Sequence, residues 1–187
     1  RDAYARLRAV LRPETVIVFH DGFRLLRWGG WFRRAGMRNV MLDTHQYLIA
    51  MEDPLFSGPA RRLYLRSRRL PWLYRMLVGA SGIAIRSAAR RIPVLVGEWC
   101  VENQWALHSQ NRSAAYRQVS RLQRAAWDVS AGQIYWSYQL ARSAKPGSGE
   151  GKPPRDPRNG GNLEAWDLTR VWRHGWIRAD TSHDDMP

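Results

Sequence analysis

The chain has 187 residues, of which 44% are hydrophobic and 25% are charged, and its formal net charge is +14. This composition can build a hydrophobic core, which excludes wholesale disorder, and the length suits one ordinary domain or part of a larger one. The single cysteine, Cys100, excludes an internal disulfide and a Cys-rich zinc module. No apolar run approaches the roughly 20 residues of a membrane span. Because the chain opens on Arg1 with neither an initiating Met nor a signal peptide, we expect it to be cut from something longer.

The positive charge comes almost entirely from arginine, since lysine occurs only as Lys145 and Lys152. The arginines are spread over nearly every predicted helix, and no zinc-finger, RNP-type or basic-region motif accompanies them. We therefore interpret them as solvated helix faces and predict no nucleic-acid partner. The alternative is a basic module that binds nucleic acid or a membrane surface, with residues 60–76 as the best candidate for contact with anionic lipid.

Helix and strand patterns alternate along the chain. They predict a helix over 2–12, a strand over 15–19, a short Trp-rich stretch from Trp28 to Gly36 and a strand over 39–43. A long connection containing Pro54, Gly58 and Pro59 then leads to helices over 60–77 and 81–90 and to a strand over 93–96. The strongest helix pattern covers 113–129, and it is followed by a strand over 133–138, a polar Gly- and Pro-rich loop over 143–162 and a helix within 163–176. The short strands lack alternation, so we expect them to be covered on both faces.

Strands that alternate with helices pair in parallel through right-handed crossovers, so the predicted fold class is α/β. Both a doubly wound sheet and a (β/α)₈ TIM barrel satisfy this rule. No Gly-x-Gly-x-x-Gly or phosphate loop follows a strand, and three of the four strands run into polar groups, as strands do at the mouth of a barrel. We therefore predict a barrel. Because a complete barrel needs about 250 residues, the chain would be only part of one.

Glu98 follows the third predicted strand directly. A carboxylate at that position faces the mouth of the barrel, where it can attack an anomeric carbon. The alternative is an ordinary solvated glutamate at the start of a loop. His45 and Tyr47 follow the second strand at positions i and i+2, so both can project toward one carboxylate and stabilise its ionised form.

Trp136, in the fourth predicted strand, offers a flat apolar platform for a sugar ring, and the alternative is a core residue. His20 with Asp21, or Asp43 with His45, could supply metal ligands, but no further His or Cys has convincing metal spacing. No Gly-x-Ser-x-Gly motif supports a serine hydrolase. We predict no metal and no cofactor.

The segments NVMLDTHQY (39–47), IPVLVGEW (92–99) and IYWSY (134–138) together resemble glycoside hydrolase family 5, most closely its exo-β-1,3-glucanase-like branch. The segment WDLTRVWRHGWI (166–177) is similar to the end of that family's domain. The resemblance implies a (β/α)₈ barrel that cleaves β-glucosidic bonds with retention through a covalent glycosyl-enzyme. It implies Glu98 as the nucleophile, His45 and Tyr47 as its companions and Trp136 as the sugar platform. His20-Asp21-Gly22-Phe23 is similar to the motif after the family's fifth strand, where the aromatic lines the cleft.

The chain departs from the family in one important way. The family's general acid/base is the Glu of an Asn-Glu motif after its fourth strand, and this chain has no Asn-Glu dipeptide. None of the other glutamates (14, 52, 102, 150 and 164) follows a predicted strand as Glu98 does. The four predicted strands would then be strands 5–8, with residues 1–180 forming the C-terminal half of the catalytic domain and 181–187 a flexible tail.

We therefore predict a retaining β-glycosidase that acts on a β-glucan or a related oligosaccharide, inactive until the N-terminal half of the barrel completes it. The predicted substrate-binding residues are His20, Asp21, Phe23, Trp99 and Trp136. The alternative is a non-catalytic glycan-binding protein, a degenerate relative that kept its aromatic residues. Sugar specificity and cellular compartment stay open.

Overall fold

The computed structural model describes residues 2–28, 30–56, 70–140 and 163–178. The chain divides into two compact units. The first unit comprises Arg1–Gln46, Met76–Trp99 and Arg124–Ile134, and the second comprises Tyr47–Arg75, Cys100–Gln123 and Tyr135–Pro187. The predicted loop over 143–162, the tail over 181–187 and most of the basic segment 60–76 lie outside the described residues.

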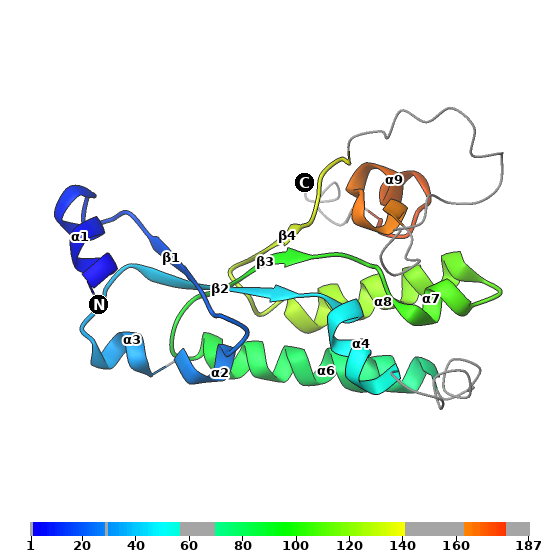
Figure 1. Ribbon diagram of the computed structural model, residues 1–187, viewed down its shortest axis with the longest axis horizontal. Coiled ribbons are helices and arrows are strands. Elements are labelled where there is room, and N and C mark those ends of the chain that lie inside the picture. The colour runs from blue at the N-terminus through cyan, green and yellow to red at the C-terminus, as the bar shows by residue number, and fades with distance from the viewer. Residues whose placement is uncertain (1, 29, 57–69, 141–162, 179–187) are drawn as a thin grey trace, which may run out of the picture. The chain divides into compact units, whose positions relative to one another are not determined.

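A four-stranded sheet organises the fold, with strands in the order β1-β2-β3-β4 (Figure 1). The strands are β1 (Ile17–His20), β2 (Val40–Gln46), β3 (Val94–Trp99) and β4 (Gly132–Tyr135). β1 pairs with β2 and β2 pairs with β3, both in parallel. Helices connect successive strands, so the predicted α/β class with a parallel sheet is confirmed.

The two faces of the sheet differ in their surroundings. Along β2 the side chains alternate between buried and half-buried, with Leu42 and Thr44 on the buried face and Asp43 on the other. Helices cover the buried face, where Phe32 packs on Phe19 with ring centroids 5.3 Å apart. The expectation that the strands are covered on both faces is therefore wrong for the described part of the chain, because a parallel sheet needs helices on both sides to bury both.

The helices, listed in chain order, are α1 (Asp2–Val10), α2 (Leu25–Trp28), α3 (Trp31–Arg34), α4 (Leu48–Phe56), α6 (Leu70–Ala89), α7 (Gln104–His108), α8 (Arg112–Trp127), the 3₁₀ turn η1 (Leu163–Trp166) and α9 (Leu168–Arg173). Two expectations are wrong. α6 is one continuous helix where the pattern predicted a break between residues 77 and 81, and α4 occupies part of the predicted connection after the second strand.

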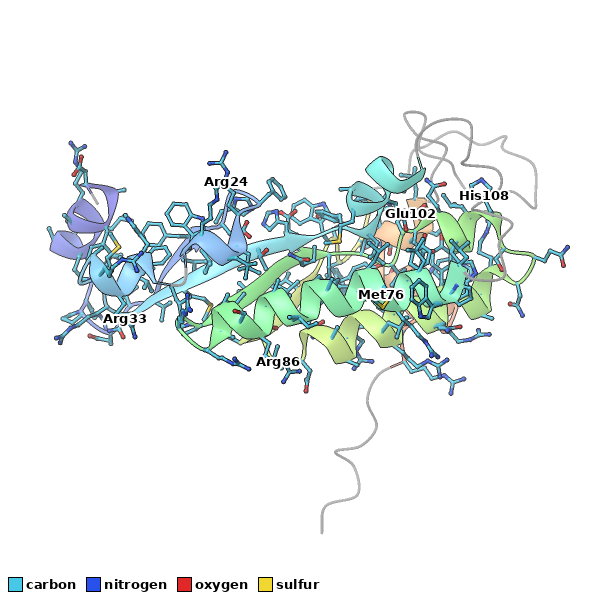
Figure 2. All side chains as sticks on the ribbon, turned by 90° about the horizontal axis from the view of Figure 1, so that it is seen from below. Arg24, Arg33, Met76, Arg86, Glu102 and His108 are labelled. Carbon is cyan, nitrogen blue, oxygen red and sulfur yellow. The ribbon has the colours of Figure 1, made fainter. Side chains whose placement is uncertain are left out.

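Close packing joins α6 to α8 in the first unit. Gly82 of α6 approaches α8 so closely that a Cβ atom there would lie 2.8 Å from the carbonyl oxygen of Ala126. The buried Trp127 donates from Nε1 to the hydroxyl of Ser81 at 2.8 Å. In both views α6 runs beside β2 and β3, and Met76 and Arg86, labelled in Figure 2, are exposed on it. The sheet therefore rests on a tightly packed helical layer.

At the start of the chain, α1 buries none of its side chains. Instead, Arg8 donates to backbone carbonyl oxygens of the loops that precede β1 and β2, among them that of Thr15 at 3.0 Å and that of Arg38 at 3.2 Å. The phenol of Tyr4 bonds to the backbone of Arg38 as well. Polar contacts thus attach α1 to the rest of the unit.

The second unit has a core of its own. Glu52 of α4 is 1% exposed, accepts a hydrogen bond from the phenol of Tyr74 and accepts another from the backbone N–H of Gln104 at 2.9 Å. Burial and the neighbouring carboxylate raise the pKa of Tyr74 well above its ordinary value.

Within the described residues, no helix combines the length and the apolarity needed to cross a membrane.

Candidate active site

Polar side chains of the first unit gather at the carboxyl ends of β1, β2 and β3. β1 ends at His20, β2 carries Asp43 and His45 near its end, and β3 carries Glu98. In the parallel ladders His20 pairs with Asp43 and, beyond a register shift between β2 and β3, His45 pairs with Glu98. These four residues form the candidate site.

A β-bulge brings His45 opposite Glu98. Up to Thr44, which pairs with Val96, the register of β2 and β3 advances one residue at a time. His45 then pairs with Glu98, so Gly97 is the extra residue of β3. A bulge turns the side chain that follows it, and here it turns a carboxylate toward an imidazole.

The contact between His45 and Glu98 is direct. Nδ1 of the imidazole lies 3.1 Å from Oε2 of the carboxylate. The two side chains are only 20% and 25% exposed, so water screens this pair less than it would on an open surface. The carboxylate is therefore held in one orientation while remaining within reach of a ligand.

The opposite ring nitrogen contacts a second acid, Asp43. Nε2 of His45 lies 3.1 Å from Oδ2 of Asp43, which is two residues earlier on the same strand face. We name the three side chains Asp43, His45 and Glu98 the carboxylate–imidazole chain. From the sequence, Asp43 was considered only as a possible metal ligand together with His45. The i and i+2 spacing of the two residues was the signal that could have assigned Asp43 to the carboxylate–imidazole chain.

Gly97 leaves room for this arrangement. A Cβ atom at that position would lie 2.0 Å from Oδ1 of Asp43 and 2.7 Å from its Cγ. The Asp43 carboxylate thus fills the space that a side chain on Gly97 would need. A side chain at position 97 and the carboxylate of Asp43 could not occupy this space together.

Two aromatic side chains, His20 at the end of β1 and Phe23 just after it, border the carboxylate–imidazole chain. The ring of His20 meets that of His45 edge-on, with centroids 4.3 Å apart, and Phe23 meets His20 in the same way at 5.3 Å. Phe23 is 76% exposed. The tight turn that presents it runs through Gly22 and Phe23, both with φ of +59°. An exposed aromatic beside a carboxylate is suited to contact a sugar ring.

Asp21 takes a different place from the predicted one. Its side chain is 1% exposed, and it accepts hydrogen bonds from the backbone N–H of Phe23 and the hydroxyl of Thr44, each at 2.8 Å. Asp21 therefore shapes the turn that carries Phe23, and its predicted contact with substrate stays a prediction.

Trp99 is also buried. It is 5% exposed and meets the buried Trp127 edge-on, with ring centroids 5.6 Å apart. Its indole belongs to the interior of the first unit, and its predicted contact with substrate stays a prediction. The side chain after Glu98 points to the opposite face of the strand from Glu98, which explains its burial.

Tyr47 and Trp136 belong to the second unit. Tyr47 stacks on Trp166 with ring centroids 5.2 Å apart, and Trp136 is 49% exposed. Trp136 follows β4, which ends at Tyr135, whereas the sequence predicted a position inside the strand. The backbone after Trp136 bonds to η1, since the N–H of Ser137 donates to the carbonyl oxygen of Trp166 at 2.7 Å. Both roles predicted for Tyr47 and Trp136 stay predictions.

The second unit also contains Glu102, the glutamate nearest to Glu98 in the sequence. It is completely buried and accepts a hydrogen bond from the phenol of Tyr116 at 3.2 Å. An internal carboxylate of this kind cannot protonate a leaving group.

In the described part of the chain, no three His, Cys, Asp or Glu side chains are arranged to hold a metal ion.

Comparison with known protein families gives no match, and comparison with curated proteins gives none either. The function therefore has to be argued from the geometry of the site itself.

Proposed function

We propose that the chain supplies strands 5–8 of a (β/α)₈ barrel and the nucleophile, Glu98, of a retaining β-glycosidase. The proposed substrate is a β-glucan or a related oligosaccharide. One observation carries the proposal: Glu98 stands at the carboxyl end of a parallel strand and is held at 3.1 Å by an imidazole from the adjacent strand. The carboxyl ends of parallel strands are where barrel enzymes place their reacting groups.

The open face of the sheet supports the barrel part of the proposal. Val18 is 49% exposed, and its partner in the register, Met41, is half-buried. In a closed barrel such inward side chains fill the interior. Half of a barrel would leave them uncovered, as they are in the described part of the first unit.

In the proposed reaction, Glu98 attacks the anomeric carbon and the glycosidic oxygen leaves, so that a covalent glycosyl-enzyme forms with inverted configuration. Water then displaces the carboxylate and restores the original configuration. His45 keeps the attacking oxygen oriented and favours its ionised form. Phe23, which is exposed beside His20, borders the sugar. The acid that protonates the leaving oxygen is proposed to come from the N-terminal half of the barrel.

A fluorinated β-glucoside with an activated leaving group tests this proposal, because such a reagent glycosylates the nucleophile without help from an acid. The test uses the chain joined to the N-terminal barrel half that the proposal requires. We expect the peptide containing Glu98 to gain the mass of one fluoroglucosyl group. Glu98→Gln should abolish labelling, whereas the matched exposed variant Glu14→Gln should not change it. Labelling of any other residue would refute the assignment.

A second candidate function is glycan binding without hydrolysis. It is favoured by the exposure of Phe23 and of Trp136, since exposed aromatic side chains can bind a sugar without cleaving it. Asp43 is bonded to His45 and so does not offer Glu98 a second acid for hydrolysis. Titration of the same joined protein with β-glucan oligosaccharides distinguishes the two. Binding that persists with no product and no labelling would support this candidate and exclude the enzyme.

A further inference from the structure

The imidazole of His45 is placed between two carboxylates, and when both are ionised this arrangement favours a ring that carries a proton on each nitrogen. Oδ2 of Asp43 and Oε2 of Glu98 are each 3.1 Å from a different ring nitrogen. A neutral imidazole has one N–H and can donate to only one of them, so its other lone pair would face an anionic oxygen. A ring protonated on both nitrogens donates to both carboxylates.

We propose that Asp43 is a positioning residue that holds His45 in the doubly protonated form and thereby keeps Glu98 ionised and fixed in orientation. The catalytic meaning of this inference rests on the proposed function. Asp43 acts only through His45 and does not touch the sugar. A positive ring between two negative carboxylates is stabilised by both of them, and a charge-assisted hydrogen bond is roughly twice as strong as a neutral one.

The placement of Asp43 supports this role. Its Oδ1 is buried and has no hydrogen-bond partner in the described part of the chain, so the bond to His45 is what its side chain gains there. The space above Gly97 receives the rest of the carboxylate. A half-buried carboxylate whose Oδ1 is buried without a partner is stabilised by a nearby positive charge, and the ring of His45 can provide it.

The groups that face His45 agree with a protonated ring. From its own strand it meets Asp43, from β3 it meets Glu98, and from β1 it meets His20. His20 accepts a hydrogen bond on Nδ1 from the backbone N–H of Gly22 at 3.1 Å, so that nitrogen serves as an acceptor. His45 therefore faces two carboxylates and no competing cation among the described side chains.

The experiment is ¹⁵N NMR of the full chain with labelled histidine, which reports directly whether each ring nitrogen carries a proton. The chain has five histidines, and the signals that vanish in His45→Gln identify the residue. We expect His45 to show protons on both nitrogens in the native chain at neutral pH. Asp43→Asn keeps the size of the side chain but removes its charge, and it should convert the His45 ring to the singly protonated form. The exposed Asp128→Asn, in the same unit, should leave the ring unchanged.

A neutral His45 in the native chain would overturn the proposal. A doubly protonated ring that is unaffected by Asp43→Asn would overturn the role of Asp43. In the joined protein, Asp43→Asn should slow labelling of Glu98 by about 10- to 100-fold, the loss expected for a hydrogen bond between charged groups. Failure of the inference and of the proposed function are distinguishable. A doubly protonated His45 without labelling refutes the glycosidase only, whereas labelling of Glu98 beside a neutral His45 refutes the inference only.

Discussion

Replacing Gly97 with alanine should break the carboxylate–imidazole chain without altering any of its members. The new Cβ atom would lie 2.0 Å from Oδ1 of Asp43, whereas ordinary van der Waals contact begins at 3.4 Å. The Asp43 carboxylate must therefore retreat by about 1.4 Å. Its bond to Nε2 of His45 is already 3.1 Å long, and a retreat of this size takes it out of hydrogen-bond range.

The expected cost follows from the bond that is lost. A hydrogen bond involving a charged group contributes about 1.5–3 kcal/mol, so Gly97→Ala should lower the free energy of unfolding by about that amount. Chemical denaturation followed by circular dichroism measures it. In the ¹⁵N spectrum of the same variant, the His45 ring should lose one of its two protons.

A second strand glycine provides the control. At Gly132 in β4 an added Cβ atom would meet only the side chain of Leu95, at an ordinary 3.5 Å. Gly132→Ala should therefore leave both the stability and the His45 signals close to those of the native chain. If Gly97→Ala were as stable as Gly132→Ala and left the His45 signals unchanged, the Asp43 carboxylate would not occupy the space above Gly97, and the reasoning would be refuted.

The remaining predictions concern stability. On α6, Gly82→Ala should destabilise by about 1–3 kcal/mol because its Cβ would meet the carbonyl oxygen of Ala126 at 2.8 Å, whereas Gly79→Ala, with nothing within 4 Å, should stabilise by up to about 1 kcal/mol in the same denaturation assay. Asp21→Ala should cost about 1–3 kcal/mol, since it removes the acceptor to which the buried hydroxyl of Thr44 donates, and a fully stable variant would contradict this. Burial opposes ionisation of Asp167, but hydrogen bonds from Thr169 and from backbone N–H groups outweigh it and lower the pKa of Asp167 below its ordinary 3.8. This carboxylate therefore stabilises the fold above that value, and the stability advantage of the native chain over Asp167→Asn should shrink as pH falls below about 4, which thermal melts from pH 6 to pH 3 would show.

The sequence predicted the parts of the fold that depend on local apolar patterns. Each of the four strands in the described residues overlaps a predicted one, although β4 ends at Tyr135 where the prediction continued to 138. The β-branched run that ends at Phe19 is an example of the apolar patterns that indicated them. The sequence failed where tertiary packing overrides local signals. The pattern predicted two helices over 60–77 and 81–90, yet α6 is continuous through this region, where Gly82 permits the close contact with α8. Pro54 suggested a loop, yet α4 forms around the buried Glu52.

The candidate site was predicted in part, for a related reason. The types of residue at the strand ends indicated that His45 and Glu98 would face each other, and they do. The contribution of Asp43 depends on a bulge at Gly97, and no local pattern reveals a register shift between two strands. The burial of Asp21 and Trp99 depends on partners from other elements, since Asp21 bonds to Thr44 of β2 and Trp99 packs on Trp127 of α8.

The claim that Glu98 is the nucleophile is tested most directly by the configuration of a rescued product. Glu98→Ala, in the joined protein, removes the carboxylate and leaves a space in which azide can attack an activated β-glucoside in its place. A single displacement inverts the anomeric carbon, so the account predicts α-glucosyl azide, identified by NMR of the product. Formation of β-glucosyl azide would make Glu98 the acid/base, and a variant with undiminished hydrolysis would remove it from the reaction altogether.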